Sequence, residues 1–140
     1  RMIVNGRVEM NPDLAEDAYA QLRLRYRLAV MTAGEYCAAG FTVVYQDVIL
    51  GADLADVVNM LKANEAVRRL RVIVLCPSPE VVAQREAGRN KTGYGAWTPA
   101  DLDAGLRNDT PRIGWWLDTS TLSVEETVAM MLAEPDRGIV

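Results

Sequence analysis

The chain has 140 residues, 50% of them hydrophobic and 24% charged, and its net charge is −4 at pH 7. This length and composition indicate one globular domain, and the acidic balance excludes a general nucleic-acid binder. The sequence contains no histidine, which excludes Ser-His-Asp and Cys-His triads and histidine-ligated metals. Any acid–base chemistry must therefore use Asp, Glu, Lys, Tyr or Cys.

The sequence carries no sign of a membrane or secreted protein. No apolar run reaches the length of a membrane span, and no signal peptide is visible. Cys37 and Cys76 lie in predicted element interiors, which indicates two buried, reduced thiols. We therefore expect a cytoplasmic protein that does not contact membranes. The first residue is Arg1 rather than Met, so the chain reads like the middle of a longer protein.

Predicted helices and strands alternate along the chain. Cap-plus-proline signals at Asn11, Ser78 and Thr98 and a capping box at Ser123 mark helix starts. The predicted helices cover residues 13–39 and 52–63, stretches that begin at 78 and at 98, and residues 123–134. Apolar, β-branched runs predict buried strands at residues 41–46, 70–76 and 113–117, and the tail from 135 is expected to fray. This order predicts an α/β layered fold with parallel strands.

Polar residues follow each predicted strand. Ligands of parallel sheets bind at the carboxyl ends of the strands, where residues 47, 77–78 and 118–120 would meet. Asp47 is interpreted either as a ligand of Mg²⁺ or an orienting group for a substrate hydroxyl, or as a loop aspartate that caps the next helix.

A cationic cluster stands out against the acidic background. Arg85 and Arg89 are one helical turn apart and Lys91 follows, so the three side chains could bind nucleotide phosphates. The alternative is a solvated helix face on which Glu80 and Glu86 pair with the arginines. Residues 90–97 would then form either a lid over the phosphates or an aromatic-anchored structural loop.

Further arginines are candidates for substrate contacts. On a helix, Arg23 and Arg27 share a face and could line an acceptor pocket, with Arg25 pointing elsewhere; a solvated face is the alternative. Arg112 could reach a substrate or phosphate, or cap a neighbouring helix. Trp115 and Trp116 are interpreted as core, because adjacent strand residues face opposite covering layers.

The order and spacing of these segments resemble a known family over nearly the whole chain. Residues 43–51 (VVYQDVILG) resemble the strand-Asp-Val-hydrophobic-Leu-Gly segment of chloramphenicol phosphotransferase-like proteins, which are P-loop small-molecule kinases. Residues 77–80 with Arg85 and Arg89 resemble the lid region of these proteins. Residues 91–95, 110–114 and 117–120 are similar to a bacterial subgroup labelled as phosphotransferase or AAA-type ATPase.

The resemblance implies a three-layer P-loop kinase fold that uses ATP and Mg²⁺ to phosphorylate a hydroxyl of a small-molecule acceptor. Asp47 would lie beside the triphosphate and help to hold Mg²⁺. Arg85 and Arg89 would be arginines of a lid at about residues 85–98, with one of the two stabilising the transferring group, and Thr119 and Ser120 would lie beside the adenine.

The chain departs from the family at its phosphate-binding part. No GxxxxGK[ST] or GxGxxG motif is present, and the family's first strand, phosphate-binding loop and base-bearing aspartate have no counterpart. Because that first strand is central in the family, the chain is predicted to be a partial domain that is inactive alone. Two alternatives stay open: a nucleotide-binding regulatory module, and a P-loop NTPase that hydrolyses ATP without transferring phosphate.

Overall fold

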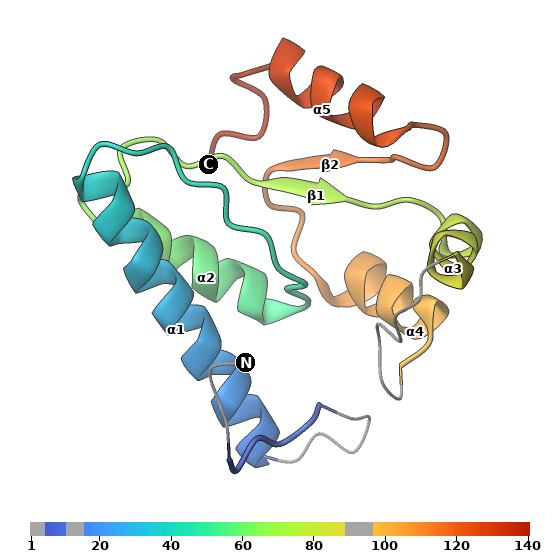
Figure 1. Cartoon of the computed structure of the whole chain (residues 1–140), viewed down its shortest axis with the longest axis horizontal. Helices are drawn as coiled ribbons and strands as arrows, with labels where there is room; N and C mark the ends of the chain where they lie inside the picture. The colour runs from blue at the N-terminus through green and yellow to red at the C-terminus, as the bar shows by residue number, and fades with distance from the viewer. Residues whose placement is uncertain (1–4, 11–15, 89–96) are drawn as a thin grey trace.

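The structure, a computed structural model, describes residues 5–10, 16–88 and 97–140 (Figure 1). Two long helices pack side by side in the first half of the chain: α1 (Glu16–Ala38) and α2 (Ala52–Lys62). Both helices were predicted, and both are confirmed. The side chains buried between them form a hydrophobic core: Tyr26, Val30, Ala33, Val57 and Leu61.

The predicted strand at residues 41–46 is wrong. The segment follows α1 as an extended stretch without strand pairing. Val43 and Tyr45 turn inward against the α1–α2 core, whereas Val44 is 90% exposed. The side chains thus alternate as in a strand with one covered face, whereas the continuous apolar run had predicted burial on both faces. Within the described residues no backbone group of 42–46 makes a backbone hydrogen bond. The segment therefore has no neighbouring strand there.

The sheet has two parallel strands, β1 (Ile73–Leu75) and β2 (Trp115–Leu117), in the register Ile73 opposite Trp115. Both strands lie within predicted segments, and the parallel pairing is confirmed. Trp115 is buried as expected, and Trp116 on the opposite face is half-buried.

The expectation of a frayed tail is wrong. The amide of Val72 donates to the carbonyl of Gly138 at 2.8 Å, and the amide of Val140 donates to that of Leu70 at 3.2 Å. Arg71 and Ile139 form an antiparallel bridge. The last residues are therefore held by the same kind of backbone pairing as a strand, which composition alone did not reveal.

Four helical segments complete the described chain around the sheet (Figure 1). They are α3 (Pro79–Ala87), α4 (Pro99–Ala104), the π-helical turn η1 (Gly105–Asp109) and α5 (Val124–Ala133). Three predicted caps are confirmed: Ser78 caps α3, and capping boxes at Thr98 and Ser123 start α4 and α5. The predicted cap at Asn11 lies outside the described residues. The described chain thus combines helices with a small parallel sheet, which is compatible with the predicted α/β class. None of the helices in these described ranges is both long and apolar enough to cross a membrane.

Candidate functional site

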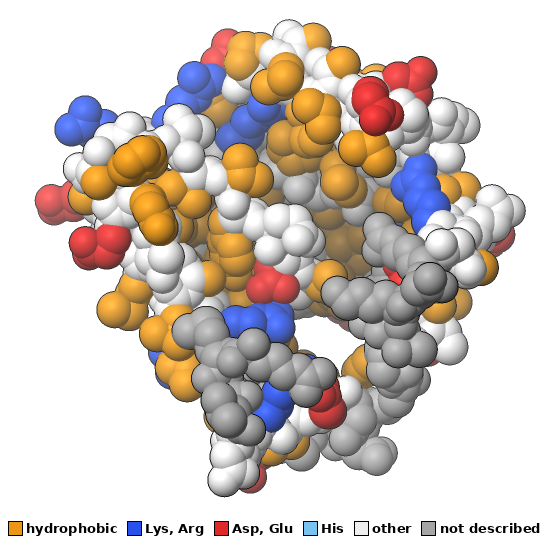
Figure 2. Space-filling model, in the orientation of Figure 1, with side chains coloured by type: hydrophobic (Ala, Val, Ile, Leu, Met, Phe, Trp, Pro, Cys, Tyr) orange, Lys and Arg blue, Asp and Glu red, His pale blue; other side chains and the backbone are white. Residues whose placement is uncertain are grey.

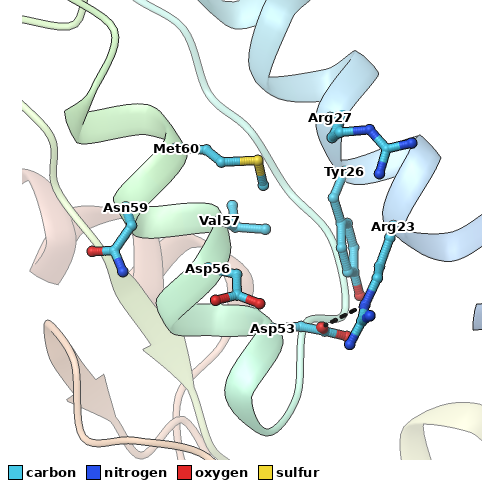
Figure 3. A pocket seen from close by; sticks show the side chains of 8 residues that line it. All are labelled: Arg23, Tyr26, Arg27, Asp53, Asp56, Val57, Asn59 and Met60. Carbon is cyan, nitrogen blue, oxygen red and sulfur yellow. Dashed lines mark ion pairs between the residues drawn. The ribbon is translucent and has the colours of Figure 1, made fainter. Parts of the chain in front are cut away.

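A pocket of about 420 Å³ lies between α1 and α2 (Figure 3). The α1 side contributes Arg23, Tyr26 and Arg27, and the side chains on the α2 side are Asp53, Asp56, Val57, Asn59 and Met60. Cationic groups of one helix and carboxylates of the other therefore line the same pocket, together with an amide and apolar groups.

The helical repeat accounts for this arrangement. Residues three or four apart lie on one helix face, so Arg23 and Arg27 project together, and so do Asp53 and Asp56. Tyr26 and Val57 also belong to the buried core, which fixes the distance between the two faces. Arg23 and Arg27 share one pocket wall and are both exposed, so the acceptor-pocket interpretation and the solvated-face alternative both stay predictions.

One ion pair crosses the pocket. The Nε of Arg23 lies 3.7 Å from the Oδ1 of Asp53, and Figure 3 marks this contact. The Asp53 side chain is 13% exposed and that of Arg23 is 60% exposed, so water screens the pair from the arginine side.

Tyr26 connects the pocket to the extended segment behind it. Its hydroxyl donates a hydrogen bond to the carbonyl of Val48 at 3.3 Å. Burial raises the pKa of Tyr26, and the negative charges of Asp47 and Asp53 raise it further. The phenol therefore stays protonated at neutral pH and acts as a hydrogen-bond donor rather than as a base.

Asp47 lies at the end of the extended segment and is surrounded by donors. It accepts hydrogen bonds from Arg25 at 3.0 Å, from the amide of Val48 at 2.8 Å and from the hydroxyl of Tyr45 at 3.4 Å. Burial raises the pKa of Tyr45 to about 12, and the negative charge of Asp47 and the hydrogen bond to it contribute to the same increase. The capping interpretation of Asp47 is wrong, because the N-cap of α2 is Gly51 and no side chain caps that helix.

The carboxyl ends of β1 and β2 meet at one edge, as predicted, and the residues there bond to one another. The amide of Ser78 donates to the hydroxyl of Ser120 at 2.8 Å, and Ser120 in turn donates to Asp118. The hydrogen bonds that Asp118 accepts from the side chain and the backbone of Ser120 lower its pKa. Thr119 is 3% exposed. The polar side chains of the loop that the resemblance places beside an adenine thus form hydrogen bonds within the protein.

Arg85 lies at this same edge, and its side chain also forms hydrogen bonds within the protein. Its Nη2 donates to the carbonyls of Thr119 at 2.9 Å and Leu122 at 3.1 Å. The other cations of the predicted cluster, Arg89 and Lys91, fall outside the described residues, as does most of the predicted lid. Arg85 by itself fixes the β2–α5 connection rather than an open anion site.

Two further arginines hold backbone and ring groups near this edge. Arg112 stacks over the ring of Trp116, with 4.0 Å between its guanidinium carbon and the ring centroid, so neither role expected for it is observed. Arg107, which sequence reasoning missed, donates to the carbonyls of Cys76 at 3.1 Å and Pro77 at 3.3 Å. Its i,i+4 spacing from Asp103 was the available signal, and the two form an ion pair at 2.8 Å.

The thiols differ in burial. Cys76 is buried and Cys37 is half-buried, and both are free. Burial raises the pKa of the Cys76 thiol, which makes it a poor nucleophile at neutral pH.

Asp53, Asp56 and Asn59 are the pocket residues that sequence reasoning missed. Their i,i+3 spacing along one short helix was visible, but their position opposite Arg23 and Arg27 depends on how α1 and α2 pack. The pocket therefore could not be predicted from the spacing of residues along either helix alone.

The described residues do not fit ATP and Mg²⁺. They include no group of three Cys, Asp or Glu side chains placed to hold a metal ion, and Asp47 is paired with Arg25. Arg85 and Thr119, which the resemblance places near the nucleotide, are respectively bonded to carbonyls and buried. No phosphoryl-transfer step can be derived from these side chains.

Comparison with known proteins identifies no family. No protein-family model matches the chain, and the searches of curated proteins and of solved structures give no match either. The resemblance to P-loop small-molecule kinases stays a prediction that depends on the motifs alone.

Proposed function

We propose that the chain is the acceptor-binding part of an ATP-dependent phosphotransferase that acts on a hydroxyl of a small molecule. The pocket between α1 and α2 is the observation that carries this proposal. Its volume suits a small molecule, its polar groups come from two fixed helices, and Arg23 and Arg27 are the residues expected to contact the acceptor.

Two unpaired backbone edges support the P-loop part of the proposal. Val72 and Cys76 bond to β2, so the alternate residues Ile73 and Leu75 direct their backbone groups to the opposite edge of β1. In the described chain no third strand pairs with that edge, and residues 42–46 also lack a backbone partner.

Both of these segments expose apolar side chains. Leu75 is 48% exposed and Val44 is 90% exposed. Figure 2 shows a hollow near the middle of the molecule, lined largely by hydrophobic side chains. A further parallel strand placed between residues 42–46 and β1 would satisfy both edges and cover this surface. The resemblance implies a strand at that position, with the phosphate-binding loop at its carboxyl end.

The test compares the 140-residue chain with a longer polypeptide that also carries any residues its gene encodes before Arg1. Isothermal titration calorimetry with Mg-ATP is expected to give binding to the longer polypeptide and none to the 140-residue chain. ADP formation by the longer polypeptide should require an acceptor. A longer polypeptide that does not bind Mg-ATP would contradict the kinase proposal, and ATP hydrolysis without an acceptor would favour the NTPase alternative.

A further inference from the structure

The charges across the α1–α2 pocket are only half paired. Arg23 and Asp53 lie 3.7 Å apart and form an ion pair. Arg27 lies one turn further along α1, and Asp56 lies three residues further along α2. Within the described residues neither of these two side chains forms an ion pair or hydrogen bond, although both line the same pocket.

Figure 3 shows how the unpaired charges are arranged. In this view Arg27 lies at the α1 rim with its side chain extended over α1, Asp56 projects from α2 beside Asp53, and the side chains of Tyr26, Val57 and Met60 lie between the two helices. Arg27 and Asp56 are both exposed. The pocket thus presents one free cation and one free anion, with apolar and aromatic groups in the space that separates them.

These free groups have different chemical preferences. The planar guanidinium of Arg27 matches a carboxylate through two parallel hydrogen bonds. The carboxylate of Asp56 accepts hydrogen bonds from an ammonium group. The four charged side chains of the pocket sum to zero, so a ligand with a single charge would match one free group and leave the other without a partner.

We propose that the acceptor bound here is a zwitterion, a hydroxylated small molecule that carries both an ammonium and a carboxylate group. Its carboxylate contacts Arg27, its ammonium contacts Asp56, and its carbon body lies against Tyr26 and Met60. The assignment of this ligand as the acceptor depends on the proposed phosphotransferase function, whereas its binding does not.

The experiment measures binding to the 140-residue chain by ligand-observed NMR titration, without ATP. Three probes form a matched set: γ-amino-β-hydroxybutyrate carries both charges, β-hydroxybutyrate lacks the ammonium, and isopropanolamine lacks the carboxylate. We expect the zwitterion to bind up to about fivefold more tightly than either singly charged probe, which corresponds to one additional exposed charged contact.

Two variants assign the contacts. Arg27→Gln should abolish the preference for the zwitterion over isopropanolamine, and Asp56→Asn should abolish the preference over β-hydroxybutyrate. Arg68→Gln and Glu35→Gln replace exposed charges outside the pocket and should leave all three affinities unchanged. Circular dichroism of each variant confirms that the helices are retained.

The outcomes separate this proposal from the proposed function. Equal affinities for the three probes, or no detectable binding of the zwitterion, would overturn the zwitterion assignment and leave the Mg-ATP test untouched. Selective zwitterion binding together with failure to bind Mg-ATP in the longer polypeptide would retain the ligand class and reject the kinase.

Discussion

Arg27 and Arg85 each belong to a pair of arginines spaced one helical turn apart, yet their side chains have different surroundings. Arg27 lines an open pocket between two helices and has no ion-pair or hydrogen-bond partner in the described chain. Arg85 donates to two backbone carbonyls beyond β2. The same spacing therefore accompanies a group available to a ligand in one region and a group that fixes a loop in the other.

The sheet region should respond most strongly to a change in backbone. Gly114 has a φ of 75°, and a Cβ there would clash with the carbonyl oxygen and side chain of Val72. We expect Gly114→Ala to lower the free energy of unfolding by at least about 3 kcal/mol in urea denaturation.

Gly40→Ala is the matched control for this substitution. Gly40 has a φ of 89°, but a Cβ would meet nothing within 4 Å. Backbone strain alone should lower the free energy of unfolding by about 1–2 kcal/mol. Equal losses for the two variants would show that the close approach to Val72 does not constrain the sheet.

The α1–α2 region should be the more sensitive to alkaline pH. The pKa of Tyr45 is raised from 10.0 to about 12, and that of Tyr26 is raised as well. Because the folded state keeps these protons, their contribution to stability is fully present below pH 10 and is lost as pH rises toward 12.

Absorbance titration of tyrosine ionisation, followed together with helical circular dichroism, checks this prediction. Tyr45→Phe should reduce the loss of stability between pH 10 and 12, whereas Tyr36→Phe, at an exposed position on α1, should not. Ordinary titration of every tyrosine in the folded chain would contradict it.

The two arginines can be compared directly. Arg85→Ala should lower the free energy of unfolding by about 1–2 kcal/mol, because two carbonyls lose a charged donor. Arg27→Ala should change it by no more than about 0.5 kcal/mol. If urea denaturation gave the reverse order, the distinction between an engaged and an available arginine would fail.

A smaller effect than at Arg85 is expected at Arg112, which stacks on Trp116. Arg112→Ala should cost about 0.5–1 kcal/mol and change the tryptophan fluorescence of the folded state. Arg68→Ala, at an exposed position without such a contact, serves as the control and should leave the emission unchanged.

Local signals in the sequence predicted the helices well, because caps such as Ser78 and Ser123 act within one helical turn. They also predicted the parallel pairing of β1 and β2. The strand at residues 41–46 was predicted wrongly because a β-branched apolar run reports burial and extended backbone, whereas a strand also requires a neighbour along its edge.

The candidate site could be predicted only in part. The shared face of Arg23 and Arg27 follows from helical spacing, but Asp53 and Asp56 lie opposite them only because α1 and α2 pack at a particular rotation. The engagement of Arg85 depends on carbonyls more than 30 residues away, as its contacts to Thr119 and Leu122 show. Spacing along one helix carries no information about such partners.

The backbone pairing of residues 138–140 with residues 70–72 has a consequence for synthesis on the ribosome. α1 and α2 and the segment between them can meet as soon as residue 62 has emerged, because their contacts are comparatively local. The pairing of Leu70 and Val72 with residues 138–140 cannot form until those residues have left the exit tunnel. The helical half can therefore fold earlier in translation than this backbone pairing.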